Sequence, residues 1–585
     1  MTRSDLVLNS QQWGQRVVGK ISPWLQLDSP HTAIRRRSEE AFKQEIAWAA
    51  HLGLPAVLLP PPGPDATNYA RLLQWACLST QHLKFVIRVP IAADDGTARN
   101  IDADMVGDAS PTSPHPPQIS HGPWASWDRL RTLCEQSSSL GVALELGVDL
   151  PDMDSEVQRW CGEPIHMVIV PTGTFLRNKK GYPALSRDHQ ATLLQLMEYT
   201  PQLVVSGRED GDHGPDDPEG IGAHLRYLEH LATKRATQDE REALEAPYRD
   251  YLQAPLQPLA DNLESSTYET FEQDPIKYKQ YQLAVRQALT ERHTANGPPA
   301  IIMVLGAGRG PLVAASLAAA AEAHRPVKVY ALDKNENAVV TLQNRKRNDP
   351  LWAQFVTVVP GDMRSWAAPV SADIIVSELL GSWGDNELSP ECLDGAMRYL
   401  KPGGISIPSS YTSTVAPLSS SKLWNEVRGL RELKHFETTY VVKVHNAFQM
   451  APAQKCFTFD HPGEAWADGW SADVPPPDNS RVCELTFDDI PTGGRLHGFV
   501  GYFHATLYKD VAISTDPETE SVGMFSWFPL YIPLRHPVLV PDGGSVSVQF
   551  WRHVSTHKVW YEWSLLSPQA SPIHNPNGRS AYIGL

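Results

Sequence analysis

Short apolar runs alternate with amphipathic stretches through residues 1–240, at a spacing that suits repeated strand–helix units. The six runs read VVGKI, PAVLLP, KFVIRVP, VALELGV, IHMVIVP and QLVVSG. Their hydrophobicity is continuous rather than alternating, which is typical of strands buried on both faces of a parallel sheet. We therefore predict an α/β domain here, with a TIM-like (β/α) barrel favoured over an open sheet. Two polar segments, 95–123 and 206–222, are expected to be surface loops.

Two further patterns divide the rest of the chain. Residues 241–296 read as helical, and a strand–helix unit then opens with AIIMVLGAGRGP, which predicts a Rossmann-like domain over 241–404. From residue 405 to 585 the hydrophobic positions alternate with period two, in TYVVKVHN, KCFTFDH, GFVGYFHATLY and SVSVQFW, with turns at PTGG and PDGG. The last third is therefore predicted to be an antiparallel β-barrel or sandwich.

Composition excludes several classes of protein. The 42% hydrophobic and 20% charged content is that of a soluble globular protein, and no apolar run approaches the roughly 20 residues that span a bilayer. The six cysteines form no CxxC pair, so neither a disulfide framework nor a metal site is expected. A net charge of −16 disfavours a nucleic acid partner. The chain opens without a secretory pattern, so we expect a cytoplasmic and nuclear protein.

A glycine loop predicts a site for a nucleoside. The apolar strand 301–305 runs into Gly306, Ala307 and Gly308, where missing side chains let a ligand approach the backbone at a helix N-terminus. The next strand ends in Asp333, which lies 333 − 310 = 23 residues after the last glycine of the loop. An acidic residue at about 20 positions is the usual partner of ribose hydroxyls.

A third strand, FVTVV, supplies candidates for the base of that nucleoside. It is followed by Asp362, which could accept the adenine amino group, and by Met363, a soft apolar side chain. A nicotinamide enzyme would favour a small residue at Pro311, whereas the same glycine and acid pattern also suits S-adenosylmethionine. Taken without the acidic residues, the glycine loop could also be a structural turn that binds no cofactor.

Two glutamates follow the strand ADIIVS. Glu378 and Glu387 are 387 − 378 = 9 positions apart, and a hairpin through Gly381 and Gly384 could bring both to one point. A carboxylate pair can clamp one guanidinium, which stays protonated because its pKa is about 12.5 or higher. Such a clamp fixes the guanidinium plane and draws positive charge away from the nitrogen that reacts. Solvated loop carboxylates are the alternative for the pair taken alone.

The segment SELLGSWGDNELSPECLDG, which carries this pair, closely resembles the double-glutamate loop of protein arginine methyltransferases, and in detail their type II branch. The resemblance extends over almost the whole chain, through RSDLVLNSQQW, VGKISPW, PLQPLADNLESSTYETFEQDPIKYKQY, GMFSWFPL and IHNPNGRSAYIGL. It implies a class I methyltransferase fold for the middle domain. It also implies methyl transfer from S-adenosyl-L-methionine to protein arginines, giving mono- and symmetric dimethylarginine without a metal.

The resemblance implies roles for individual residues. Glu378 and Glu387 would be the catalytic pair, and Asp333 would hold the ribose of the cofactor. The other cofactor contacts would be Tyr268, Lys277, Tyr278, Gly306, Gly308, Asp362 and Met363. Product and substrate specificity would depend on Phe271, Trp527 and Phe528, where Phe271 matches the aromatic residue that type II enzymes carry in place of methionine. For these three aromatic residues, core packing is the alternative.

Two departures from the family pattern stand out. Position 333 is Asp where related type II enzymes lead us to expect Glu, which puts cofactor affinity in question. The chain also begins later than its relatives, so either the N-terminal barrel is open, lacking its first strand–helix unit, or the gene model is incomplete.

The resemblance further implies partners: histone tails and arginine-glycine-rich RNA-processing proteins as substrates, a WD-repeat adaptor on the N-terminal barrel, and a homo-oligomer formed through the C-terminal region. Other functions remain as alternatives. The chain could be an adaptor-recruiting scaffold with little activity, or a methyltransferase with asymmetric or monomethylated products, or one acting on a small molecule or nucleic acid. The intact glycine loop and both glutamates argue against an inert scaffold.

Overall fold

The computed structural model describes residues 7–63, 65–92, 122–151, 156–207, 221–235, 240–292, 297–466 and 469–585. It divides into two compact units. The first comprises Met1–Leu244 with Ser420–Asn425 and Asn446–Phe448, and the second comprises the remainder. The two segments predicted as surface loops, 95–123 and 206–222, lie almost entirely outside the described residues.

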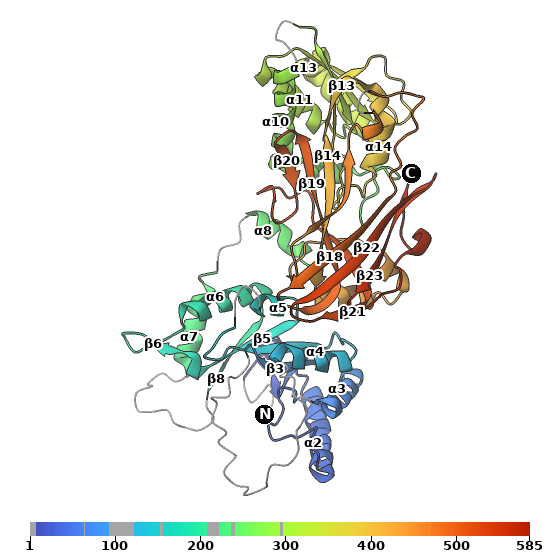
Figure 1. Cartoon of the computed structure of the whole chain (residues 1–585). Helices are drawn as coiled ribbons and strands as arrows, with labels where there is room; N and C mark the ends of the chain where they lie inside the picture. The colour runs from blue at the N-terminus through green and yellow to red at the C-terminus, as the bar shows by residue number, and fades with distance from the viewer. Residues whose placement is uncertain are drawn as a thin grey trace. The chain divides into compact units, whose positions relative to one another are not determined.

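The first unit is built on one parallel sheet of six strands (Figure 1). Its strand order is β1-β2-β3-β4-β5-β8, and every neighbouring pair is parallel. The strands are β1 (Gly19–Lys20), β2 (Ala56–Leu59), β3 (Lys84–Pro90), β4 (Leu140–Glu145), β5 (Ile165–Pro171) and β8 (Gln202–Ser206). Each of the six apolar runs thus gives one strand. Among the described residues the edge strands β1 and β8 do not pair with one another.

Both faces of this sheet are buried, which explains the continuous hydrophobicity of its strands. On one face Phe85 and Ile87 of β3 join the main core with residues of the helices, whereas on the other face Val86 packs with Ala143 and Met167. The helices are α1 (Ser10–Arg16), α2 (Thr32–His51), α3 (Thr67–Ser79), α4 (Pro123–Leu133), α5 (Gln158–Cys161), α6 (Arg187–Leu196) and α7 (Ile221–Ala232). The predicted strand–helix alternation is confirmed.

The second unit begins with helices and a five-stranded parallel sheet in the order β11-β10-β9-β12-β13. Its strands are β9 (Ala300–Leu305), β10 (Val327–Asp333), β11 (Val356–Pro360), β12 (Ala372–Ser377) and β13 (Leu400–Ile407). Nearly all of α8 (Glu240–Glu245) belongs to the first unit. The helices of the second unit that surround this sheet are α9 (Ser265–Glu272), α10 (Pro275–Arg292), α11 (Pro311–Ala323), α12 (Glu336–Asn348), α13 (Pro350–Phe355) and α14 (Ser389–Ala396). The strand order reverses between β9 and β12, and ligands of such doubly wound sheets bind outside the carboxyl ends of the strands at this point.

The C-terminal part of this unit consists of two antiparallel sheets. The larger has the order β15-β21-β19-β14-β16, with β17 paired to β14 and β20 to β19, and the smaller has the order β18-β22-β23-β24. The strands are β14 (Ser410–Ser419), β15 (Tyr440–Val441), β16 (Phe448–Gln449), β17 (Gln454–Asp460), β18 (Arg481–Ile490), β19 (Gly494–Tyr508), β20 (Val511–Ser514), β21 (Leu530–Val540), β22 (Gly544–Val554), β23 (Lys558–Ser567) and β24 (Ile583–Gly584). The prediction of a full strand at TYVVKVHN was wrong, because only Tyr440–Val441 joins a sheet.

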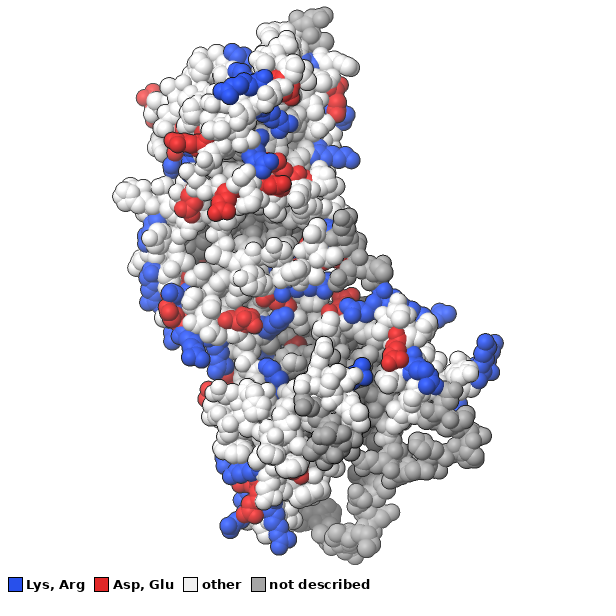
Figure 2. Space-filling view, turned by 180° about the vertical axis from the view of Figure 1, so that it is seen from behind, with Lys and Arg blue, Asp and Glu red and all other residues white. Residues whose placement is uncertain are grey.

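Charges of both signs are interspersed on the molecular face that Figure 2 shows. No helix of the described residues is both long and apolar enough to cross a membrane. Within the same residues, no group of three or more His, Cys, Asp or Glu side chains could hold a metal ion.

Candidate active site

The glycine loop follows β9 at the switch point of the sheet. Gly306 has a positive φ of 73°, and a Cβ placed there would lie 2.9 Å from Cδ2 of Leu379 and 3.8 Å from Cε of Met363. The position therefore requires glycine both for its conformation and for the close approach of the Leu379 side chain. The loop, Met363 and the start of the glutamate segment are brought together, as the sequence predicted.

Asp333 ends β10 and is buried beside this loop. One carboxylate oxygen accepts a hydrogen bond from the Gly308 N–H at 2.7 Å, and the other accepts from the Asn335 N–H at 2.7 Å. Burial raises the pKa of Asp333, and these two N–H donors oppose the rise. Each oxygen retains a lone pair, so the carboxylate can still accept from two hydroxyl groups.

Tyr268 of α9 covers the same corner. A Cβ on Gly308 would lie 3.1 Å from the Tyr268 ring, and the Tyr268 hydroxyl accepts a hydrogen bond from the Asn335 side chain at 3.3 Å. Asn335 thus joins Tyr268, Gly308 and Asp333, and sequence reasoning missed it. Its signal was available, because an Asn just before a helical segment is a typical N-cap, and Asn335 does cap α12.

Asp362 follows β11 and is held by an ion pair. Its carboxylate accepts from the Arg364 side chain at 2.8 Å and from the Arg364 N–H at 2.8 Å. Partial burial acts to raise the pKa of Asp362, but the bonds from Arg364 outweigh it, so the pKa is lowered overall. Gly361, the preceding residue, donates to the Asp333 carbonyl at 2.9 Å. Asp362 is therefore an ionised acceptor next to the nucleoside candidates.

The two glutamates flank the predicted hairpin. Gly381 and Gly384 exchange backbone hydrogen bonds of 3.1 and 2.8 Å, and Gly384 has a φ of +82°. The Asn386 side chain accepts from the Trp383 N–H at 2.7 Å and closes the turn from inside. The turn that the two glycines predicted is confirmed.

One lysine, Lys277, interacts with the charges of both glutamates. The Lys277 ammonium of α10 lies 3.1 Å from an oxygen of Glu378, and its side chain is only 1% exposed. The pKa of Glu387 is raised well above its ordinary value, first by burial and then by the charge of Glu378, with Lys277 acting in the opposite direction. The structure therefore places both glutamates and Lys277 in one electrostatically coupled site.

Aromatic rings enclose this lysine. The ammonium lies 5.4 Å from the ring centre of Phe271, 4.8 Å from that of Tyr278 and 4.9 Å from that of Trp527. The Trp527 indole donates to the Leu380 carbonyl at 2.8 Å, which fixes its ring against the glutamate segment. Three aromatic residues proposed from the sequence thus surround the ammonium that Glu378 binds.

Phe528 is not part of this enclosure. Its ring packs against Tyr248, with ring centres 5.8 Å apart, and lies 5.8 Å from the Lys443 ammonium.

Asp274 connects the cofactor side of the site to the aromatic side. Its fully buried carboxylate accepts from the N–H groups of Ile276 and Lys277 with one oxygen, and so caps α10. The other oxygen accepts from the Phe525 N–H, the Ser526 N–H and the Ser526 hydroxyl, all at 2.8 to 2.9 Å. Sequence reasoning missed Asp274, although an Asp before a Pro is a recognisable helix start.

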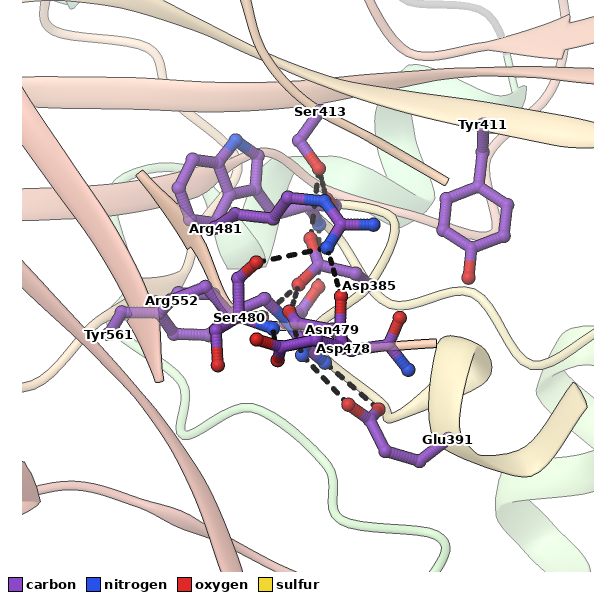
Figure 3. A network of polar contacts seen from close by, with 12 residues as sticks. Asp385, Glu391, Tyr411, Ser413, Asp478, Asn479, Ser480, Arg481, Arg552 and Tyr561 are labelled. Atoms are coloured by element: carbon purple, nitrogen blue, oxygen red, sulfur yellow. Dashed lines mark hydrogen bonds and ion pairs between the residues drawn. The ribbon is translucent and has the colours of Figure 1, made fainter. Parts of the chain in front are cut away.

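A second buried network anchors the turn between the glutamates (Figure 3). One oxygen of Asp385 accepts from Arg552 of β22 and from the Tyr561 hydroxyl of β23, each at 2.6 Å, and the other accepts from Ser413 of β14 at 2.9 Å. Arg552, which is fully buried, also makes a bidentate pair with Glu391 at 2.8 and 2.9 Å. No local sequence pattern predicts this network, because Arg552 lies 167 positions from Asp385.

Comparison with known proteins finds related chains. Three family models match successive parts of the chain: the PRMT5 TIM barrel domain at residues 1–254, the PRMT5 arginine-N-methyltransferase at 239–407 and the PRMT5 oligomerisation domain at 410–583. Among solved structures, the Trypanosoma brucei PRMT1 enzyme-prozyme heterotetrameric complex with AdoHcy aligns at 15% identity and a TM-score of 0.43. That alignment covers 55% of this chain and 98% of the other.

Curated relatives match over nearly the full length. Protein arginine N-methyltransferase 5 of Oryza sativa subsp. japonica is 46% identical over 610 residues, covering 100% of this chain and 90% of the relative. The protein of the same name from Xenopus laevis is 46% identical over 594 residues, with the same coverage. Protein arginine N-methyltransferase skb1 of Schizosaccharomyces pombe is 38% identical, covering 97% and 88%. The chain therefore belongs to the PRMT5 arginine-N-methyltransferase family.

Proposed function

We propose that this chain transfers methyl groups from S-adenosyl-L-methionine to arginine guanidinium nitrogens in proteins, and that its final product is symmetric dimethylarginine. Membership of an arginine N-methyltransferase family gives the reaction class. The observation that carries the proposal is the coupled pair Glu378 and Glu387, which faces one aromatic-walled cation site at the sheet's switch point.

The charge state of the pair suits a guanidinium. Glu378 already accepts one cation, since Lys277 lies 3.1 Å from it, whereas the pKa of Glu387 is raised because burial and Glu378 both disfavour its ionised form. A guanidinium that enters the site supplies the missing positive charge, so it lowers the pKa of Glu387 and completes a clamp of two carboxylates. The clamp holds the planar cation in one orientation and polarises it.

The residues around the glycine loop fit the cofactor. Gly306 and Gly308 leave the backbone accessible, Asp333 offers acceptors for ribose hydroxyls, and Asp362 offers an acceptor for an adenine amino group. S-adenosyl-L-methionine, when bound, supplies a methyl group activated by its sulfonium. Asp is one methylene shorter than Glu, so at position 333 its partners must approach the strand end more closely than they would approach a Glu.

The symmetric product rests on Phe271. Its ring faces the Lys277 ammonium at 5.4 Å, in the same enclosure as Trp527. A stiff ring at this position limits the space beside the reacting nitrogen, so a nitrogen that already carries one methyl group fits less well than the unmodified nitrogen. The second methyl group then goes to the other terminal nitrogen.

The proposal extends to partners and location. We infer that histone tails and arginine-glycine-rich RNA-processing proteins are substrates, and that the protein acts in the cytoplasm and nucleus. Residues 410–583 match an oligomerisation domain, which supports a homo-oligomer formed through the C-terminal part. A WD-repeat adaptor on the N-terminal barrel is the proposed protein partner.

The test is to methylate an arginine-glycine-rich peptide with the full chain and to distinguish the dimethyl isomers by mass spectrometry. Symmetric dimethylarginine should accumulate, and Glu387→Gln should abolish it while Glu518→Gln, at an exposed glutamate, should not. Asymmetric product alone would overturn the product assignment. Cofactor binding without any methylation, on this peptide or on histone tails, would favour the scaffold function instead.

A further inference from the structure

Two of the six cysteines form a partly exposed pair in the C-terminal part. Cys456 lies on β17 and Cys483 on β18, and both are partly exposed, whereas the other four cysteines are buried. The Cys483 sulfur lies 3.9 Å from the carbonyl oxygen of Lys455, the residue that precedes Cys456. The Cys483 thiol therefore sits against the backbone of the strand that carries Cys456.

The two strands belong to different sheets. β17 pairs with β14 in the larger sheet, and β18 pairs with β22 in the smaller one. No backbone ladder joins β17 to β18 in the described residues, so the Cys483 thiol reaches the backbone of β17 across the seam between the sheets. A bond between the sulfurs would link these sheets covalently.

The two thiols differ in chemistry. A hydrogen bond from Cys456 lowers the pKa of Cys483, whereas burial, and then Cys483 itself, raise the pKa of Cys456. The Lys455 carbonyl and the Asp385 carboxylate near the pair carry no positive charge that could stabilise a thiolate. The Cys456 thiol is therefore the group that favours the Cys483 thiolate. A reactive thiolate beside a second thiol is the arrangement of a redox-sensitive cysteine with its resolving partner.

We propose that Cys456 and Cys483 are a peroxide-sensitive dithiol that forms a reversible disulfide. The Cys483 thiolate attacks one oxygen of hydrogen peroxide, the O–O bond breaks, and a sulfenic acid and hydroxide form. The Cys456 sulfur then attacks the sulfenic sulfur, its proton and the departing hydroxide leave as water, and the S–S bond closes. Two thiols are oxidised and one peroxide is reduced to two waters. A small-molecule dithiol reverses the reaction.

The disulfide would form next to the catalytic turn. Phe457, which follows Cys456, packs its ring against Trp383, with ring centres 5.4 Å apart. Trp383 stands between the two catalytic glutamates in the sequence. The cross-link would therefore fix the strand on which this turn rests.

A second cysteine pair in the same chain is a matched control. Cys77 and Cys134 influence one another electrostatically, but both are buried, and burial raises their pKa values to about 11 and about 12. Both thiols therefore carry less thiolate than Cys483 and are shielded from the oxidant, so this pair should oxidise more slowly, by about tenfold or more. Both pairs are measured in the same protein sample, with the same oxidant and in the same digest.

The experiment treats the reduced full chain with hydrogen peroxide, blocks remaining thiols with N-ethylmaleimide and maps the digest by mass spectrometry. Cys456 and Cys483 should lose alkylation together and appear as a linked peptide about 2 Da lighter than the sum of its reduced parts. Dithiothreitol should restore both, and Cys77 and Cys134 should oxidise at least about tenfold more slowly. In Cys456→Ser, dimedone should trap Cys483 as a sulfenic acid. The proposal is overturned if no linked peptide forms, or if all four cysteines oxidise at the same rate.

Discussion

Removing the charge of Glu378 or of Glu387, the two glutamates proposed as the catalytic pair, should change stability in opposite directions. Glu378 accepts a hydrogen bond from a Lys277 ammonium that is 1% exposed. Glu378→Gln retains an acceptor oxygen for the ammonium but removes the negative charge, so an ion pair becomes a hydrogen bond between a cation and a neutral amide. The buried lysine is left without its counter-charge, so we expect a loss of about 1 to 2 kcal/mol in the free energy of unfolding.

For Glu387, the expected change in the free energy of unfolding has the opposite sign. Its folded-state pKa lies above the unfolded value of about 4.3, so the stability it contributes is complete below that pH and is lost as the pH rises through the folded pKa. Above its unfolded pKa, Glu387 therefore costs the fold stability, because on folding it must either keep a buried charge or bind a proton. Glu387→Gln removes this cost and should stabilise the protein.

Turnover should fall in both variants. Removal of one preorganised charged group from such a site typically lowers kcat by about 100- to 1,000-fold. In the parent protein, kcat/KM should also decrease as the pH falls through the raised pKa of Glu387, because the protonated acid no longer clamps the guanidinium.

The assay combines peptide methylation with urea unfolding, and Glu518→Gln controls for the loss of a negative charge at an exposed site. With a denaturant slope of about 2 kcal/mol/M, Glu378→Gln should lower the urea midpoint by about 0.5 to 1 M, and Glu387→Gln should raise it. Midpoints that shift in the same direction would refute the electrostatic reasoning. Near-parental turnover in either variant would refute the clamp.

Four further outcomes are expected. Asp333→Ala should weaken S-adenosylmethionine binding by about 1 to 3 kcal/mol in calorimetry, because its polar partners lose an acceptor, and an unchanged affinity would contradict the ribose assignment. Phe271→Met should yield asymmetric dimethylarginine, since a flexible thioether can move aside, and an active variant with wholly symmetric product would reduce Phe271 to a packing residue. Asp274→Asn should raise the KM for peptide and leave the far-UV circular dichroism spectrum nearly unchanged, because the segment with Phe525 and Ser526 loses its charged anchor. An unchanged KM would refute this. Light scattering at micromolar concentration should give a mass above that of one chain, and a strictly monomeric mass would exclude the proposed homo-oligomer.

Local patterns predicted the elements that carry the site. The six apolar runs gave six parallel strands because burial on both faces leaves no polar alternation to misread. The Gly381 and Gly384 turn was equally accessible, since only glycine readily adopts the conformation found at position 384. The helix starts at Asn335 and Asp274 were visible as N-caps but were not recognised as parts of the site.

The strand predicted at TYVVKVHN shows the limit of local patterns. The backbone of Val441 exchanges hydrogen bonds with Gln253, at 3.0 and 2.9 Å, and the Val442 N–H donates to the Pro529 carbonyl at 3.0 Å. Gln253 lies in another segment, whereas Pro529 immediately precedes β21, so the pairing with β21 ends close to Val441 although the alternation continues. A period of two indicates which side chains are buried, but it does not indicate which backbone groups will be available as partners.

The candidate site lowers the stability of the fold. This explains why the residues that hold it in place lie far from it in the sequence. Two glutamates with coupled charges flank a turn with glycines at 381 and 384, so neither the charges nor the local backbone favour the catalytic geometry. The turn is held instead through Asp385, whose two oxygens accept from Arg552, Tyr561 and Ser413 on three strands of the C-terminal sheets. Because Arg552 is fully buried and its charge is matched by carboxylates, removing any partner would leave a charge stranded in the interior. The C-terminal sheets therefore fix the turn between the two glutamates, which the local sequence could not maintain alone.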